Sequence, residues 1–211
     1  MSTIQVGKSA ATQLKAGAAI LAAARTVDTR LIKDRLGAFD RAQQGYADAH
    51  AKVLQAEASL ETAQVEFRTE QEAVVDGLAR ALLADGQPLR HPFAGFGAAT
   101  QGAIMHMPPG EVVKALPQLI ATIRRSKTLG KLTLQALPAA EKATRAMDQA
   151  VTRMDDLRTA AHNAHATRDA VAQKWEAALG ALSPADFVSA RRSALRCGDP
   201  SRHLWRAEYL R

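Results

Sequence analysis

Two regularly spaced series of residues dominate the first half of the chain. At intervals of seven, one series consists mainly of large apolar residues: Phe39, Tyr46, Val53, Leu60, Phe67, Val74 and Ala81. A neighbouring series begins with four alanines: Ala42, Ala49, Ala56 and Ala63. Apolar a and d positions in a heptad repeat bury one face of a helix against a partner, so the pattern predicts a long coiled-coil helix over 37–86. The small alanine side chains would let the partner approach closely.

A second stretch, 138–182, repeats this mixture of bulky and alanine positions. Its stripe consists of Met147, Ala150, Met154, Leu157, Ala161, Ala164, Val171, Trp175, Ala178 and Leu182. Pro138 suits the first turn of this helix, because the missing proline N–H has no helical partner there. We therefore predict an all-α fold, a long antiparallel coiled-coil hairpin or helical bundle. Phe39 would lie near Leu182, and Ala81 near Ala140.

The remaining segments are expected to complete the same structural domain. Residues 1–36 form an N-terminal helix, and residues 183–211 form short C-terminal helices that begin with a Ser-Pro start signal. The apolar stripe shifts between Asp28 and Gly37, which leaves open whether the first helix continues into the long one. Gly86 is placed to end the first long helix, with Pro88 as a stop.

Residues 87–137 form a Pro/Gly-rich, basic insertion at the tip of the hairpin. Its first part, 87–110, is predicted to be a long loop, and Pro117 is expected to kink or divide the helix that follows. Phe93 and Phe96 either anchor the loop on the bundle or present a binding surface. A short amphipathic segment then combines a Leu/Ile face with four cations. Together with two lysines near the N-terminus, these side chains are the candidate interaction residues: Phe93, Phe96, Arg124, Arg125, Lys127, Lys131, Lys8 and Lys15.

Charge is distributed unevenly along this basic chain, whose formal net charge is +7. Residues 46–86 carry three Lys/Arg against eight acidic residues, whereas residues 87–137 carry six against one. The acidic run can be an ordinary solvated face or can meet basic residues of a neighbouring copy. It consists of Glu57, Glu61, Glu66, Glu70, Glu72 and Asp76.

Composition narrows the class of protein further. The chain is 47% hydrophobic and 23% charged, which is typical of a folded protein, and no strand-like alternation is present. There is no apolar run long enough for a transmembrane helix. The single cysteine, Cys197, fits a reducing compartment, so a cytoplasmic location is expected.

No motif for catalysis, metal or nucleotide binding stands out, so we expect neither an enzyme nor a cofactor. Gly7-Lys8-Ser9 lacks the leading glycine of a phosphate-binding loop. His162, His165 and Asp169 share a helical face but lack a fourth ligand, which favours solvated side chains over a metal site.

Three hypotheses for function remain. The first is a non-enzymatic scaffold that forms homo-oligomers through its coiled coil or docks into a larger protein assembly. The second is a protein of anionic membrane surfaces, since long basic helical hairpins are similar in outline to BAR-type curvature modules. The third is non-specific nucleic-acid binding, which the basic charge permits but no motif supports.

Overall fold

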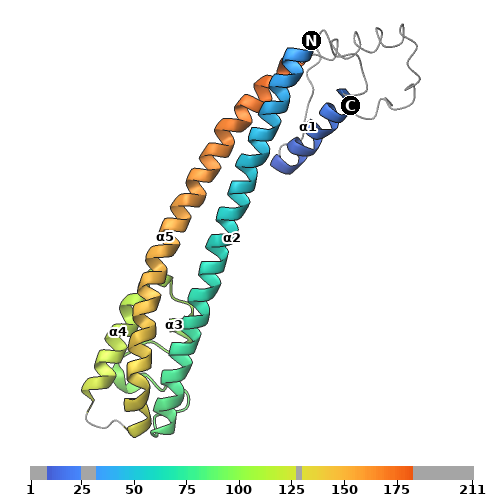
Figure 1. Ribbon diagram of the computed structural model, residues 1–211. Helices are drawn as coiled ribbons and strands as arrows, with labels where there is room; N and C mark the ends of the chain where they lie inside the picture. Colours follow the sequence, from blue (N-terminus) through green and yellow to red (C-terminus); the bar gives the residue numbers. More distant parts are fainter. Residues whose placement is uncertain (1–8, 25–31, 127–129, 183–211) are drawn as a thin grey trace. The chain divides into compact units, whose positions relative to one another are not determined.

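The computed structural model describes residues 9–24, 32–126 and 130–182, and these residues form helices without any strand. The two long helices pack as an antiparallel hairpin, which confirms the predicted all-α fold (Figure 1). The predicted C-terminal helices in 183–211 lie outside the described residues. The elements are α1 (Ala10–Ala24), α2 (Lys33–Ala84), the 3-10 helix η2 (Ala94–Phe96), α3 (Gln101–Met105), α4 (Pro109–Arg125) and α5 (Lys131–Gly180).

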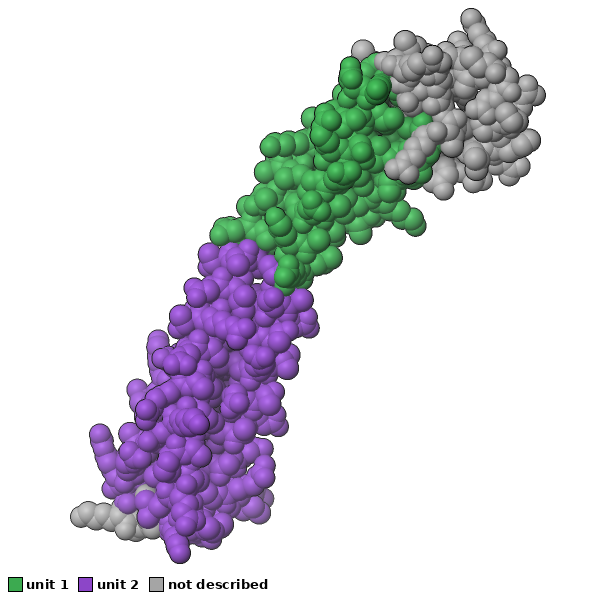
Figure 2. All heavy atoms as spheres, in the orientation of Figure 1, with its two compact units in different colours: residues 1–55, 162–211 green, residues 56–161 purple. Residues whose placement is uncertain are grey.

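The chain divides into two compact units, which Figure 2 shows in separate colours. Unit 1 consists of residues 1–55 and 162–211, and unit 2 consists of residues 56–161. Each unit has its own cluster of buried apolar side chains. No helix in the described part of the chain combines the length and apolar character needed to cross a bilayer.

Unit 1 has an aromatic core between the first part of α2 and the last part of α5. The ring of Trp175 lies 5.8 Å, centroid to centroid, from both Phe39 and Tyr46. Leu179 and Leu182 are buried in the same cluster. Phe39 therefore meets the end of the second long helix, as the antiparallel register predicts. Aromatic residues dominate such cores because each removes a large apolar area from water.

Helix α1 lies beside α2, so it does not extend the long helix. The side-chain amide of Gln43 donates a 2.8 Å hydrogen bond to the carbonyl oxygen of Leu14, and the Tyr46 hydroxyl donates one of 2.6 Å to Gln13 Oε1. Gly17 allows this approach, because a Cβ at that position would overlap the Gln43 side chain. The first helix is therefore separate from the long helix and does not continue into it.

Unit 2 combines the second part of α2 and the first part of α5 with α3 and α4. Its core includes Leu82, Leu137 and Ala140, so the ends of the two long helices meet here as predicted. The amide of Gln71 on α2 donates a 2.7 Å hydrogen bond to the carbonyl oxygen of Ile104 on α3. This buried bond holds the short helix onto the long one.

Helix α4 is amphipathic, with one apolar face and one polar face. Its buried face packs into the core of unit 2, and its cations lie on the other side. Pro117 lies on the exposed side, and the helix is assigned as one continuous element from Pro109 to Arg125. Of the two predicted effects of this proline, a kink or a division of the segment, the division is therefore excluded. The buried residues are Val112, Leu116, Leu119, Ile120 and Ile123.

Two boundaries in the insertion also differ from the prediction. Helix α5 begins at Lys131, so Pro138 lies inside it rather than at its start. An early start is possible because the Asp85 side chain bonds to the first turn of α5, a contact between residues distant in sequence. Residues 87–110 are also not a simple loop, since they contain η2 and α3.

The end of α2 is as predicted. Gly86 adopts a positive φ of 91°, and its N–H bonds to the carbonyl oxygen of Leu83. The N–H of Gln87 bonds to the carbonyl oxygen of Leu82, which completes a Schellman motif. Glycine is favoured at this site because it has no Cβ and therefore adopts a positive φ without a steric clash.

Candidate functional site

The predicted candidate residues fall in different places. Lys15 is exposed on α1 in unit 1, whereas Arg124, Arg125 and Lys131 are exposed in unit 2. Lys8 and Lys127 lie outside the described residues. Unit 2 therefore contains most of the candidate interaction residues that the structure describes.

The two phenylalanines of the insertion have different environments. Phe93 is completely buried in the core of unit 2, so it anchors the chain between α2 and α4 and offers no surface to a ligand. Phe96 is half-buried and packs against the same core. The anchoring interpretation is correct for Phe93, and only Phe96 keeps an accessible edge.

Phe96 borders an open pocket of about 260 Å³ between the η2–α3 segment and α4, with an accessible lining that is more polar than apolar. The pocket contains no titratable side chain, and its polar side chains are an amide and a hydroxyl on α4. Such a pocket offers no titratable group for acid–base chemistry. Its lining consists of Phe96, Gly97, Ala98, Ala99, Ile104, Met107, Ala115, Gln118, Leu119 and Thr122.

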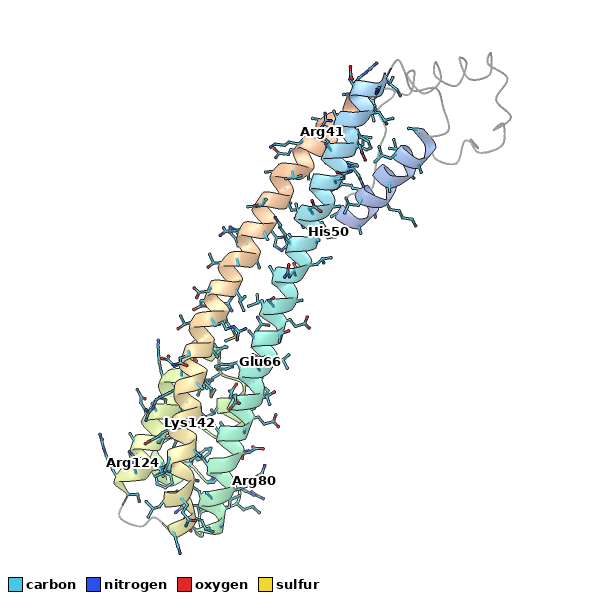
Figure 3. The ribbon with its side chains drawn as sticks, in the orientation of Figure 1. Arg41, His50, Glu66, Arg80, Arg124 and Lys142 are labelled. Carbon is cyan, nitrogen blue, oxygen red and sulfur yellow. The ribbon has the colours of Figure 1, made fainter. Side chains whose placement is uncertain are left out.

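Helices α2 and α4 end, and α5 begins, at one end of unit 2 (Figure 1), and the segments there carry several cations. We call this set the basic tip; it consists of Arg90, Arg124, Arg125 and Lys131, all exposed. Arg124 projects from α4 at this end (Figure 3) and forms a 2.7 Å ion pair with Glu141 on α5. The other three form no ion pair with any residue that the structure describes. The basic tip therefore carries uncompensated positive charge.

Three leucines in the same region are exposed, although sequence patterning did not select them. The exposed fractions are 83% for Leu89, 50% for Leu132 and 51% for Leu134. Leu89 lies in the turn closed by the His91 N–H and the carbonyl oxygen of Pro88, and the other two lie in the first turn of α5. The structure explains the exposure of two of them, because Leu132 and Leu134 flank Thr133, whose burial defines the inward face of that turn.

A different surface lies on the outer face of α2 in unit 2. Val65 is 58% exposed, although its neighbours Ala63 and Phe67 are buried. At 3.6 residues per turn, Val65 lies opposite this buried seam, on the same side as Glu61 and Glu72. Neither carboxylate pairs with another described residue, and exposed Arg68 lies one turn from Val65 on the same side, so this face is mostly acidic around one apolar side chain.

Other candidate chemistry is limited. Among the residues that the structure describes, no three metal-binding side chains gather into a possible metal site. Asp169, which shares a helical face with His162 and His165, forms a 2.6 Å ion pair with Arg168. The carboxylate is therefore engaged by its neighbour on α5.

Comparison with known proteins adds no assignment. No protein-family model matches the chain, and neither the curated proteins nor the solved structures contain a significant match.

Proposed function

We propose that the protein is a non-enzymatic helical scaffold that assembles with further copies of itself through its long helices. The observation that carries this proposal is the outer face of α2 in unit 2. There Val65 remains 58% exposed between unpaired carboxylates, although the seam on the opposite side of the helix is already filled. Apolar positions flanked by charged ones are the arrangement through which helices dock in coiled coils.

A second copy of the chain is the partner that charge favours. The protein has a net charge of +7, so the acidic outer face of α2 differs in sign from the chain as a whole. A neighbouring copy would therefore offer basic residues to this face. Complementary charges of this kind set orientation and association rate, while burial of Val65 supplies apolar contact.

Sedimentation velocity over a range of protein concentrations tests the proposal. We expect concentration-dependent oligomers that weaken as salt is raised, because the paired charges are at the surface. A triple variant should raise the dissociation constant at least about tenfold, since it reverses two charges and removes the apolar contact. It consists of Glu61→Lys, Val65→Ser and Glu72→Lys.

The matched control makes the same two charge reversals on the other long helix. It consists of Asp148→Lys and Asp156→Lys, both at exposed positions on α5. This control should retain the oligomer. A wild-type protein that stays monomeric at every concentration would contradict self-association, and equal losses in both variants would contradict the assignment to this face. Electron microscopy of the purified protein would then distinguish filaments, rings and compact oligomers.

A further inference from the structure

The end of unit 2 combines two features, a group of cations without ion pairs to any residue that the structure describes, and a group of exposed leucines. Three uncompensated cations of the basic tip lie there, and so do three of the five large apolar side chains that are exposed in the described residues. We infer that this end of unit 2 binds an anionic lipid surface, with the leucines entering the interface and the cations contacting the headgroups. This inference is independent of self-association through α2.

The geometry places these groups at one end of one unit. Asp85 follows α2 and accepts a 2.8 Å hydrogen bond from the N–H of Thr133, which fixes the turn containing Leu132 and Leu134 beside the end of α2. Leu89 follows in the chain a few residues after Asp85. The ion pair between Arg124 and Glu141 likewise holds the end of α4 against α5. The leucines and cations therefore share this end of the fold.

Acidic side chains at this end do not cancel the positive charge. The Asp85 carboxylate bonds to the first turn of α5, and the Glu141 carboxylate is occupied by Arg124. Glu111 lies in the first turn of α4, at the opposite end of that helix from Arg125. Asp85 and Glu141 remain ionised and offset part of the positive charge, but the four cations of the basic tip outnumber these two carboxylates, so an approaching anionic surface meets a net positive charge.

The exposed leucines favour a lipid surface over a nucleic acid. Apolar side chains gain free energy when they leave water for the boundary between headgroups and acyl chains. Nucleic acids instead require cations along the phosphate backbone, together with aromatic or hydrogen-bonding side chains at the bases. The exposed large side chains at this end of unit 2 are aliphatic, and Phe93 is buried.

Co-sedimentation of the full chain with phosphatidylcholine vesicles, with and without phosphatidylserine, tests this inference. We expect binding to the vesicles that contain phosphatidylserine, with loss at high salt. Each cation near an anionic surface contributes roughly a fivefold factor, so removing three should lower partitioning on the order of a hundredfold. The tip charge variant consists of Arg90→Gln, Arg125→Gln and Lys131→Gln.

The chain provides a control with the same loss of charge at exposed positions away from this end: Lys52→Gln, Arg153→Gln and Lys174→Gln. This control should bind far more tightly than the tip charge variant. Absence of wild-type binding at low salt would overturn the inference, as would equal losses in the two variants. Tip-dependent binding to single-stranded RNA without binding to vesicles would also overturn it, and would assign the surface to nucleic acid.

The apolar contribution needs its own variant. Replacing Leu89, Leu132 and Leu134 by serine should lower partitioning at least about tenfold, because the apolar contact with the interface is lost. The control is Leu54→Ser, at a similarly exposed leucine on α2, and should bind as the wild type does. If the triple variant unfolds, the single variant Leu89→Ser replaces it in the experiment, because Leu89 lies in an exposed turn and its substitution should leave the fold intact. Unchanged binding of a folded leucine variant would contradict the insertion of these side chains.

Discussion

The carboxylate of Asp85, just past the end of α2, accepts a 2.8 Å hydrogen bond from the backbone N–H of Thr133 in the first turn of α5. The first N–H groups of a helix have no partner within the helix, so Asp85 supplies the cap from a different element. Gly130, which directly precedes α5, has no side chain to do so, and a Cβ there would overlap the Asp85 carboxylate. This contact therefore joins the two long helices at the end of unit 2.

The Asp85 cap predicts a pH-dependent contribution to stability. The nearby Thr133 hydroxyl, followed by the Thr133 backbone N–H, lowers the pKa of the Asp85 carboxyl below its ordinary value of 3.8. Because the folded state has the lower pKa, this stability is present above pH 3.8 and is lost as the pH falls through the folded-state pKa. Asp85→Asn should therefore unfold more easily than the wild type at neutral pH, and the difference should shrink in acid. Urea denaturation at a series of pH values measures it; a constant difference down to the lowest pH would contradict the assignment.

Gly130→Ala should disturb the same contact. The new Cβ would force the Asp85 side chain to rotate away, so α5 would lose its cap and the midpoint of thermal unfolding should fall. Gly77→Ala is the matched control, because no atom lies within 4 Å of its added Cβ inside α2. The control should stabilise the protein by about 0.5–1 kcal/mol, since alanine favours a helix. In an Asp85→Ala background, Gly130→Ala should no longer lower the midpoint; an undiminished loss there would point to a different clash.

Gln43 predicts a large effect in unit 1. Its Oε1 accepts a 2.6 Å hydrogen bond from the Trp175 indole N–H, while its amide nitrogen donates to the carbonyl oxygen of Leu14. Gln43→Leu leaves the buried indole N–H of Trp175 without a partner, whereas the Leu14 carbonyl oxygen lies inside α1 and keeps its helical hydrogen bond, so we expect a loss of about 1–3 kcal/mol. Tryptophan fluorescence during denaturation measures this loss, with Trp205→Phe leaving Trp175 as the only reporter. The exposed neighbour provides the control: Gln44→Leu should change stability by less than about 0.5 kcal/mol.

Tyr46 should ionise at higher pH than an ordinary tyrosine. Burial raises its pKa above 10.0, opposed by Arg168 and reinforced by the Asp169 and Glu176 carboxylates. The folded state favours the neutral phenol, so this stability is present below pH 10.0 and is lost as the pH rises through the folded-state pKa. Absorbance of the phenolate in a Tyr209→Phe variant reports Tyr46 alone, because the chain has two tyrosines. Titration at the ordinary value in the folded variant would show that the phenol is open to water.

The heptad spacing by itself determined the two long helices and their antiparallel pairing. A helix repeats every 3.6 residues, so apolar side chains at intervals of seven define one buried face without reference to any distant residue. Matching lengths of the two patterned stretches then placed Phe39 with the end of α5, where Trp175 and Leu182 lie. Local chemistry also ended α2 correctly, because Gly86 provides the positive φ that the Schellman motif requires.

Only the tertiary structure decided which polar side chains join these helices and which apolar ones remain exposed. In the sequence, Gln43 is one of many polar residues on a predicted helix, and nothing marks it as buried. Its burial depends on α1, which lies close to it at Gly17. The early start of α5 depends on Asp85, which is distant in sequence. Phe93 and Leu89 lie in the same insertion, but the fold buries one and exposes the other. Periodicity records only local spacing, whereas burial depends on neighbours that the fold brings together.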